Sequence, residues 1–142
     1  METNNDIRQI ISYFKNRDEV SALYLFGSIG RGRETKESDI DIAILIDESR
    51  LKRKSYDILK KEYFSASPRF TLRPVDIVIL NTASPNLKHH ILKKGKMLFD
   101  RNRRLRVLFT ARAIVEYLDY KPIEDICLGA VANRFRRATV GR

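Results

Sequence analysis

The feature that most constrains this chain is a Gly27-Ser28 pair followed, after ten residues, by Asp39-Ile40-Asp41. An apolar run over residues 22–26 precedes the glycine, and a second apolar run over residues 42–46 follows the last aspartate. Runs of this length and composition predict two strands. The segment therefore joins a tight turn to a pair of carboxylates within one short unit.

The turn after the first of these strands predicts an anion site. Gly27 lets the backbone turn tightly and lets a ligand come close. A helix that begins near Ser28 would offer free N–H groups and a favourable dipole to a phosphate, and the serine hydroxyl can bond a phosphate oxygen. Gly27, Gly30 and Gly32 could instead form a dinucleotide loop, but this short chain lacks the regular alternation of strands and helices which that fold needs.

Three aspartates predict a divalent metal site. Asp39 and Asp41 are two residues apart on a predicted strand, so both carboxylates project from one face. Asp76 lies within another strand pattern, residues 74–80. Like charges held close together need a compensating cation, and oxygen-only ligands suit Mg²⁺. Three carboxylates on adjacent strands would allow two Mg²⁺ ions, as in two-metal phosphoryl chemistry.

The remaining pattern predicts an α/β fold, with a small mixed sheet, flanking helices and a helical C-terminal part. Strands are expected at about residues 20–26, 39–46 and 70–80, with a short edge strand at 96–99. Helices are expected from Asn4 or Asn5 to residue 14, over residues 48–65, from Ser84-Pro85 to Gly95, and on both sides of Pro122. We expect one domain over residues 1–142, with a catalytic core in residues 1–100 and C-terminal helices in residues 101–142.

Composition narrows the class of protein further. The chain has no apolar stretch of about 18 residues and no signal-peptide pattern at its polar N-terminus, so a cytoplasmic protein is expected. Cys127 is the single cysteine, and its place on an apolar helical stripe predicts burial. His89 and His90 are expected to be exposed or packing side chains. The net charge of +10 favours an anionic partner, but no nucleic-acid-binding module is present, so nucleic acid is not the favoured one.

Two segments together resemble the signature of the minimal nucleotidyltransferases, which belong to the DNA polymerase beta-like superfamily. They are Phe26-Gly27-Ser28-Ile29-Gly30-Arg31-Gly32 and Ser38-Asp39-Ile40-Asp41-Ile42. The resemblance extends from about residue 20 to residue 100. Many members have arginine where this chain has Ile29, so one positive side chain near the phosphates is missing, but no metal ligand is lost.

The resemblance implies a role for each part of the motif. Gly27, Ser28 and Arg31 would bind the phosphates of the substrate, ATP. The metal ligands would be three carboxylates, those of Asp39, Asp41 and Asp76. The last of these is also the candidate acceptor for the proton of the attacking hydroxyl.

The resemblance also implies an acceptor. Free-standing minimal nucleotidyltransferases are often encoded beside a helical HEPN-family ribonuclease toxin, and as antitoxins they transfer AMP to a toxin tyrosine. The toxin's own signature, Arg-x4-His-x-Tyr, is absent from this chain. The leading hypothesis is therefore an Mg²⁺-dependent antitoxin that adenylylates a HEPN toxin partner. The alternatives are a non-catalytic antitoxin that occludes the toxin, and a small-molecule (antibiotic) nucleotidyltransferase, although only residues 101–142 follow the core to hold an acceptor.

Overall fold

The computed structural model describes residues 2–27 and 39–140 of the chain. Within these residues a four-stranded sheet has the order β3-β2-β1-β4. The strands are β1 (Val20–Phe26), β2 (Ile40–Ile46), β3 (Val75–Ile79) and β4 (Lys96–Asp100). β1 is antiparallel to β2 and to β4, whereas β2 and β3 are parallel. The predicted small mixed sheet is confirmed, including the short strand near residues 96–99.

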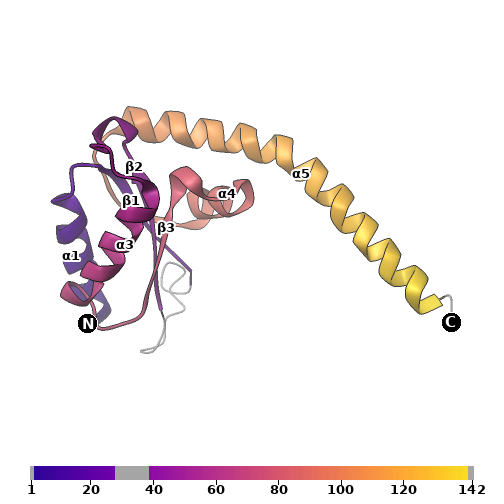
Figure 1. The fold of residues 1–142 in the computed structure, drawn as a ribbon, viewed down its shortest axis with the longest axis horizontal. Helices are drawn as coiled ribbons and strands as arrows, with labels where there is room; N and C mark the ends of the chain where they lie inside the picture. Colours follow the sequence, from indigo (N-terminus) through magenta and orange to yellow (C-terminus); the bar gives the residue numbers. More distant parts are fainter. Residues whose placement is uncertain (1, 28–38, 141–142) are drawn as a thin grey trace.

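Helices cover both faces of this sheet (Figure 1). In chain order they are α1 (Glu2–Lys15), the short η1 (Glu48–Arg50), α3 (Tyr56–Ala66), the short η2 (Ser67–Arg69) and η3 (Leu80–Thr82), α4 (Pro85–Lys94) and α5 (Arg103–Val140). Phe14 of α1 and Tyr63 of α3 are fully buried on one face, together with the isoleucines of β2. Ala43 and Leu45 of β2 point to the other face, where α4 and the start of α5 pack. Alternation along the strand therefore places Asp41 on the face that α4 and α5 cover.

Several predicted boundaries are confirmed and others are wrong. Ser84 caps α4 by accepting a hydrogen bond from the backbone N–H of Leu87, and Gly95 follows the last residue of that helix. The predicted helix over residues 48–65 is divided, because Lys52 and Arg53 have φ values of 48° and 67°, which a right-handed helix cannot include. The third strand is shorter than predicted, and α1 begins before the predicted asparagine cap.

α5 is one helix of 38 residues, so the predicted break at Pro122 is wrong. A proline removes one backbone hydrogen bond, and good helix formers such as Lys121 and Glu124 continue the helix around it. Figure 1 shows the second half of α5 extending away from the sheet. Cys127 lies on this half and is exposed, so its predicted burial is wrong. Although α5 is long, no described helix is apolar enough over a sufficient length to cross a membrane.

An ion pair between the buried Lys88 of α4 and the half-exposed Glu116 of α5 attaches the two helices. Lys88 Nζ lies 3.1 Å from Glu116 Oε2, and the Lys88 side chain is only 9% exposed. We expect Glu116→Ala to lower the free energy of unfolding by about 1–2 kcal/mol, because the buried ammonium loses its carboxylate. Urea denaturation measures the change. In the control Asp125→Ala, which removes an exposed partner of Lys121 on the same helix, the loss should stay below about 0.5 kcal/mol; equal losses in the two variants would contradict the prediction.

Candidate active site

Asp41 and Asp76 lie side by side on the parallel strands β2 and β3, on the same face of the sheet. They are direct partners in the register of the two strands, so their Cα atoms lie roughly 5 Å apart. Burial raises the pKa of Asp41, and the neighbouring carboxylates of Asp76 and then Asp39 raise it further. Asp39 lies exposed one residue before β2. The three predicted carboxylates therefore interact electrostatically, and their mutual repulsion favours a bound cation.

Gly27 brings the end of β1 against the same site. The register of β1 and β2 pairs Phe26 with Asp41, so Gly27, the residue that follows β1, lies at the carboxylate. Gly27 has a φ of +75°, and a Cβ atom built on it would lie 2.0 Å from Asp41 Oδ2. The left-handed backbone therefore favours glycine at this position, and any larger residue would displace the Asp41 carboxylate.

The carboxylates fit a magnesium ion that is shared with a substrate. No group of three or more His, Cys, Asp or Glu residues within 2–27 and 39–140 is arranged to hold a metal ion on its own. Mg²⁺ commonly takes only one or two protein carboxylates and fills its remaining positions with water and substrate phosphates. Asp41 and Asp76 suit that pattern, because they lie side by side and Asp76 is exposed to an incoming ligand. The site of three carboxylates and two ions remains a prediction.

Two of the predicted phosphate-binding residues, Ser28 and Arg31, lie outside the described part of the chain, so their roles remain predictions.

His89 was predicted to be an exposed or a packing side chain. Its ring stacks on Tyr117 of α5 at a centroid distance of 3.7 Å and an interplanar angle of 2°. This packing between α4 and α5 agrees with the prediction that His89 is an exposed or packing side chain.

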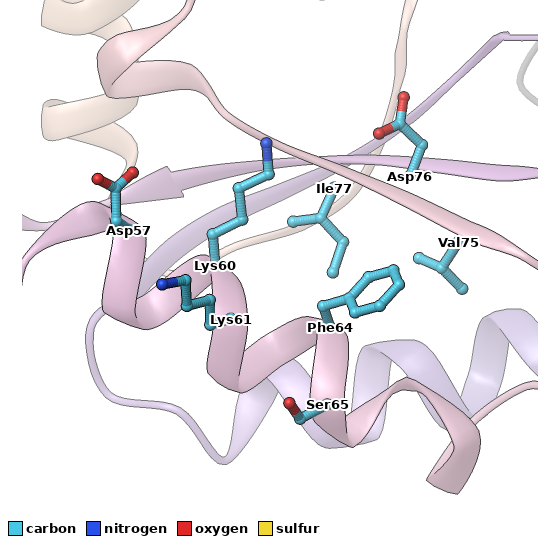
Figure 2. Close-up of a pocket in the computed structure, with 8 residues that line it drawn as sticks. All are labelled: Asp57, Lys60, Lys61, Phe64, Ser65, Val75, Asp76 and Ile77. Atoms are coloured by element: carbon cyan, nitrogen blue, oxygen red, sulfur yellow. The ribbon is translucent and has the colours of Figure 1, made fainter.

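A groove beside Asp76 was not anticipated from the sequence. It lies between β3 and α3 and is drawn in Figure 2. Its lining residues are Asp57, Lys60, Lys61, Phe64, Ser65, Val75, Asp76 and Ile77. Leu59 and Tyr63 form the buried apolar side of α3, whereas the groove lies on the exposed side of this helix. The available signal was Phe64, an aromatic residue in a lysine-rich stretch outside that apolar stripe.

Comparison with known proteins decides the family. The family described as "Polymerase beta, Nucleotidyltransferase" matches residues 8–104, which is more than half of the chain. The chain belongs to this nucleotidyltransferase family. The matched residues include Gly27, Asp41 and Asp76, so the site described above lies inside the nucleotidyltransferase domain.

Relatives of this nucleotidyltransferase were found by sequence and by structure. A Methanocaldococcus jannaschii protein named as a candidate protein adenylyltransferase is 40% identical over 53 residues, which is 34% of this chain and 53% of that protein. The chain thus spans about half the length of this curated relative. One chain of a toxin–antitoxin crystal structure with AMP-PNP has a TM-score of 0.67 and 26% identity, over 89% of this chain and 98% of that one.

Two further solved structures share the fold of this nucleotidyltransferase. A chain of the toxin–antitoxin pair MntA–HepT has a TM-score of 0.69 and 23% identity, over 89% of this chain and 97% of that one. A chain of a tri-AMPylated Shewanella oneidensis HEPN toxin in complex with its MNT antitoxin has a TM-score of 0.69 and 24% identity, over 93% and 99% of the two chains. The predicted polymerase beta-like fold and the resemblance to minimal nucleotidyltransferases are confirmed.

Proposed function

We propose that this protein is an Mg²⁺-dependent adenylyltransferase that transfers AMP from ATP to a tyrosine hydroxyl of a HEPN-type toxin and thereby acts as its antitoxin. One observation carries the proposal: Asp41 and Asp76 lie side by side next to the Gly27 turn in a nucleotidyltransferase domain. Burial, and then repulsion by Asp76 and Asp39, raises the pKa of Asp41, and this repulsion makes the site receptive to a cation that carries ATP with it. Since the reaction consumes ATP, we place it in the cytoplasm.

The donor side of the reaction is assigned to the turn after β1. Gly27 and Ser28 would hold the triphosphate, because their backbone allows close approach and their free N–H groups attract phosphate oxygens. Arg31 would add a positive charge to the same phosphates. These contacts orient the α-phosphate of ATP for in-line attack, and positioning of this kind supplies much of the catalysis in phosphoryl transfer.

The acceptor side is assigned to the carboxylates. Asp39, Asp41 and Asp76 would hold two Mg²⁺ ions, which when bound neutralise phosphate charge and polarise the α-phosphate. Asp76 is exposed on the edge strand, and it would accept the proton of the attacking tyrosine hydroxyl. The tyrosine oxygen bonds to the α-phosphorus, the α–β phosphoanhydride bond breaks, and pyrophosphate leaves.

α5 supports a protein as the acceptor. Large apolar side chains along it are exposed by 45–72%, namely Val107, Leu108, Ile114, Val115, Leu118, Ile123, Ile126, Leu128 and Val131. Apolar surface of this extent is typical of a site for another protein. Residues 101–142 also carry ten Lys or Arg against four Asp or Glu, which suits an acidic partner surface. A HEPN toxin is the proposed partner because the similar solved structures include complexes with such a toxin.

Labelling with ATP tests the proposal directly. The purified protein is incubated with Mg²⁺ and ATP labelled at the α-phosphate, with and without the product of the neighbouring gene. We expect label on the neighbouring protein, at tyrosine, and no label when EDTA is present. A tight complex that never acquires label would reject adenylylation.

A second function, inhibition by occlusion, is favoured by the exposed apolar surface of α5 alone. An occluding antitoxin would bind the toxin through α5 and would need no transfer. The two functions differ in one result, the ability of Asp41→Asn to neutralise the toxin in cells. Loss of neutralisation supports adenylylation, whereas full neutralisation by the variant supports occlusion.

A further inference from the structure

A groove of about 450 Å³ follows the outer edge of β3. Val75, Asp76 and Ile77 all line it, although successive residues of a strand point to opposite faces. The groove must therefore run along the edge of the strand and not over one face of the sheet. β3 is the outermost strand on this side among the described residues, so its outer backbone groups are open to a ligand.

The opposite wall of the groove is the outer side of α3, which presents residues spaced by three and four positions. Phe64 is 61% exposed, and Figure 2 shows its ring pointing toward Val75 and Ile77. Lys60 and Lys61 are exposed beside it, and neither forms an ion pair with a carboxylate of the described residues. The groove thus combines an accessible aromatic ring with two lysines, and Asp57 and Asp76 also line it.

The position of the groove identifies it with the acceptor. Across the sheet, Gly27 at the end of β1 comes first, Asp41 on β2 follows, and Asp76 on β3 is outermost. With the triphosphate of ATP at Gly27, the groove lies on the far side of the carboxylates. A group held in the groove would therefore approach Asp76 from the side opposite to the donor.

We propose that this groove binds an AMP unit already attached to the acceptor protein, and that it thereby promotes the addition of further AMP units. The inference rests on the proposed function. An aromatic ring stacks on a nucleobase, and ammonium groups pair with a phosphodiester, so Phe64, Lys60 and Lys61 match both parts of an AMP ester. An unmodified tyrosine side chain has neither a nucleobase nor a phosphate.

The second transfer then follows the chemistry of the first. A ribose hydroxyl oxygen of the bound AMP forms a bond to the α-phosphorus of a new ATP. The α–β phosphoanhydride bond breaks, pyrophosphate leaves with the bonding electrons, and the hydroxyl proton passes to Asp76. The acceptor grows by one AMP unit, and its new terminal AMP is again a ligand for the groove.

Binding of a small ester tests the groove without any partner. The probe is N-acetyltyrosinamide adenylylated on its phenolic oxygen, titrated calorimetrically into the full-length protein. We expect Phe64→Ala, and separately Lys60→Ala with Lys61→Ala, to weaken binding about tenfold each. The matched controls are Ile58→Ala, also half-exposed on α3, and Lys93→Ala with Lys94→Ala on α4, which should bind as the wild type does.

Each outcome decides the inference. Equal affinity in wild type and groove variants, or no binding to the wild type, overturns it. Tighter binding of an oligoadenylate RNA than of the tyrosine ester reassigns the groove to RNA and also overturns it. Groove-dependent binding supports it even if labelled ATP marks no partner, a result that would reject only the proposed function. With an active partner, the groove variants should lower the ratio of multiply to singly modified partner, measured by intact mass.

Discussion

Asp41→Asn is expected to reduce AMP transfer by roughly 10³-fold, because it removes a charged metal ligand at the point where three carboxylates and the Gly27 turn meet. Asparagine keeps the size of the side chain, so Gly27 can still approach it. The loss should lie in the rate at saturating substrate, measured as pyrophosphate release or label transfer. Asp18→Asn is the matched control, since Asp18 is exposed in the turn before β1. Activity in Asp41→Asn that equals that of the control would remove Asp41 from the mechanism.

Asp41→Asn should not lower the stability of the fold, and the direction of the pKa shift of Asp41 explains why. Its pKa is raised in the folded protein by burial and then by Asp76 and Asp39, so the ionised carboxylate opposes folding. In EDTA, the contribution of Asp41 to wild-type stability should be most favourable below the ordinary Asp pKa and should fall as the pH rises through the raised value. Thermal melts between about pH 4 and pH 7 should show this fall in the wild type and a smaller one in Asp41→Asn. A less stable variant at neutral pH would mean that its inactivity reflects misfolding.

Local patterns were sufficient to predict the sheet and the position of two carboxylates. Apolar runs next to Asp41 and around Asp76 predicted strands, and a strand places its charged residues by alternation alone. The pairing of those strands was a weaker inference, since register depends on contacts distant in sequence. The structure shows that Asp41 and Asp76 are direct partners, which a single sequence does not contain.

Other features could not be predicted, because they depend on what packs around a helix or strand. Two predictions, the helix break at Pro122 and the burial of Cys127, assumed that this part of the chain packs in the core of the domain. Figure 1 shows the second half of α5 extending away from the sheet, so the apolar residues there do not indicate a core. The groove beside Asp76 was missed for the reverse reason, since Phe64 belongs to no apolar stripe and acquires a role only beside the edge of β3.

Gly27→Ala is expected to lower transfer by roughly 10²-fold even though it alters no charged group, because it displaces Asp41. The added Cβ atom would lie 2.0 Å from Asp41 Oδ2, so the carboxylate has to rotate away from its place beside Asp76. The backbone at +75° also strains an alanine by about 1–2 kcal/mol. A side chain can rotate more easily than a strand can shift, so we expect a folded protein with a modestly lower melting temperature and poor activity.

The matched control for this prediction is Gly129→Ala on α5. A Cβ atom there meets no heavy atom within 4 Å, so alanine should stabilise the helix by about 0.5–1 kcal/mol and leave transfer unchanged. Comparing Mg²⁺ affinity in the two variants separates the causes. Weakened Mg²⁺ binding in Gly27→Ala alone would indicate a displaced Asp41, whereas normal Mg²⁺ binding with weak ATP binding would indicate damage to the phosphate turn. Full activity in Gly27→Ala would contradict both, since the close approach of Gly27 to Asp41 would then have no part in catalysis.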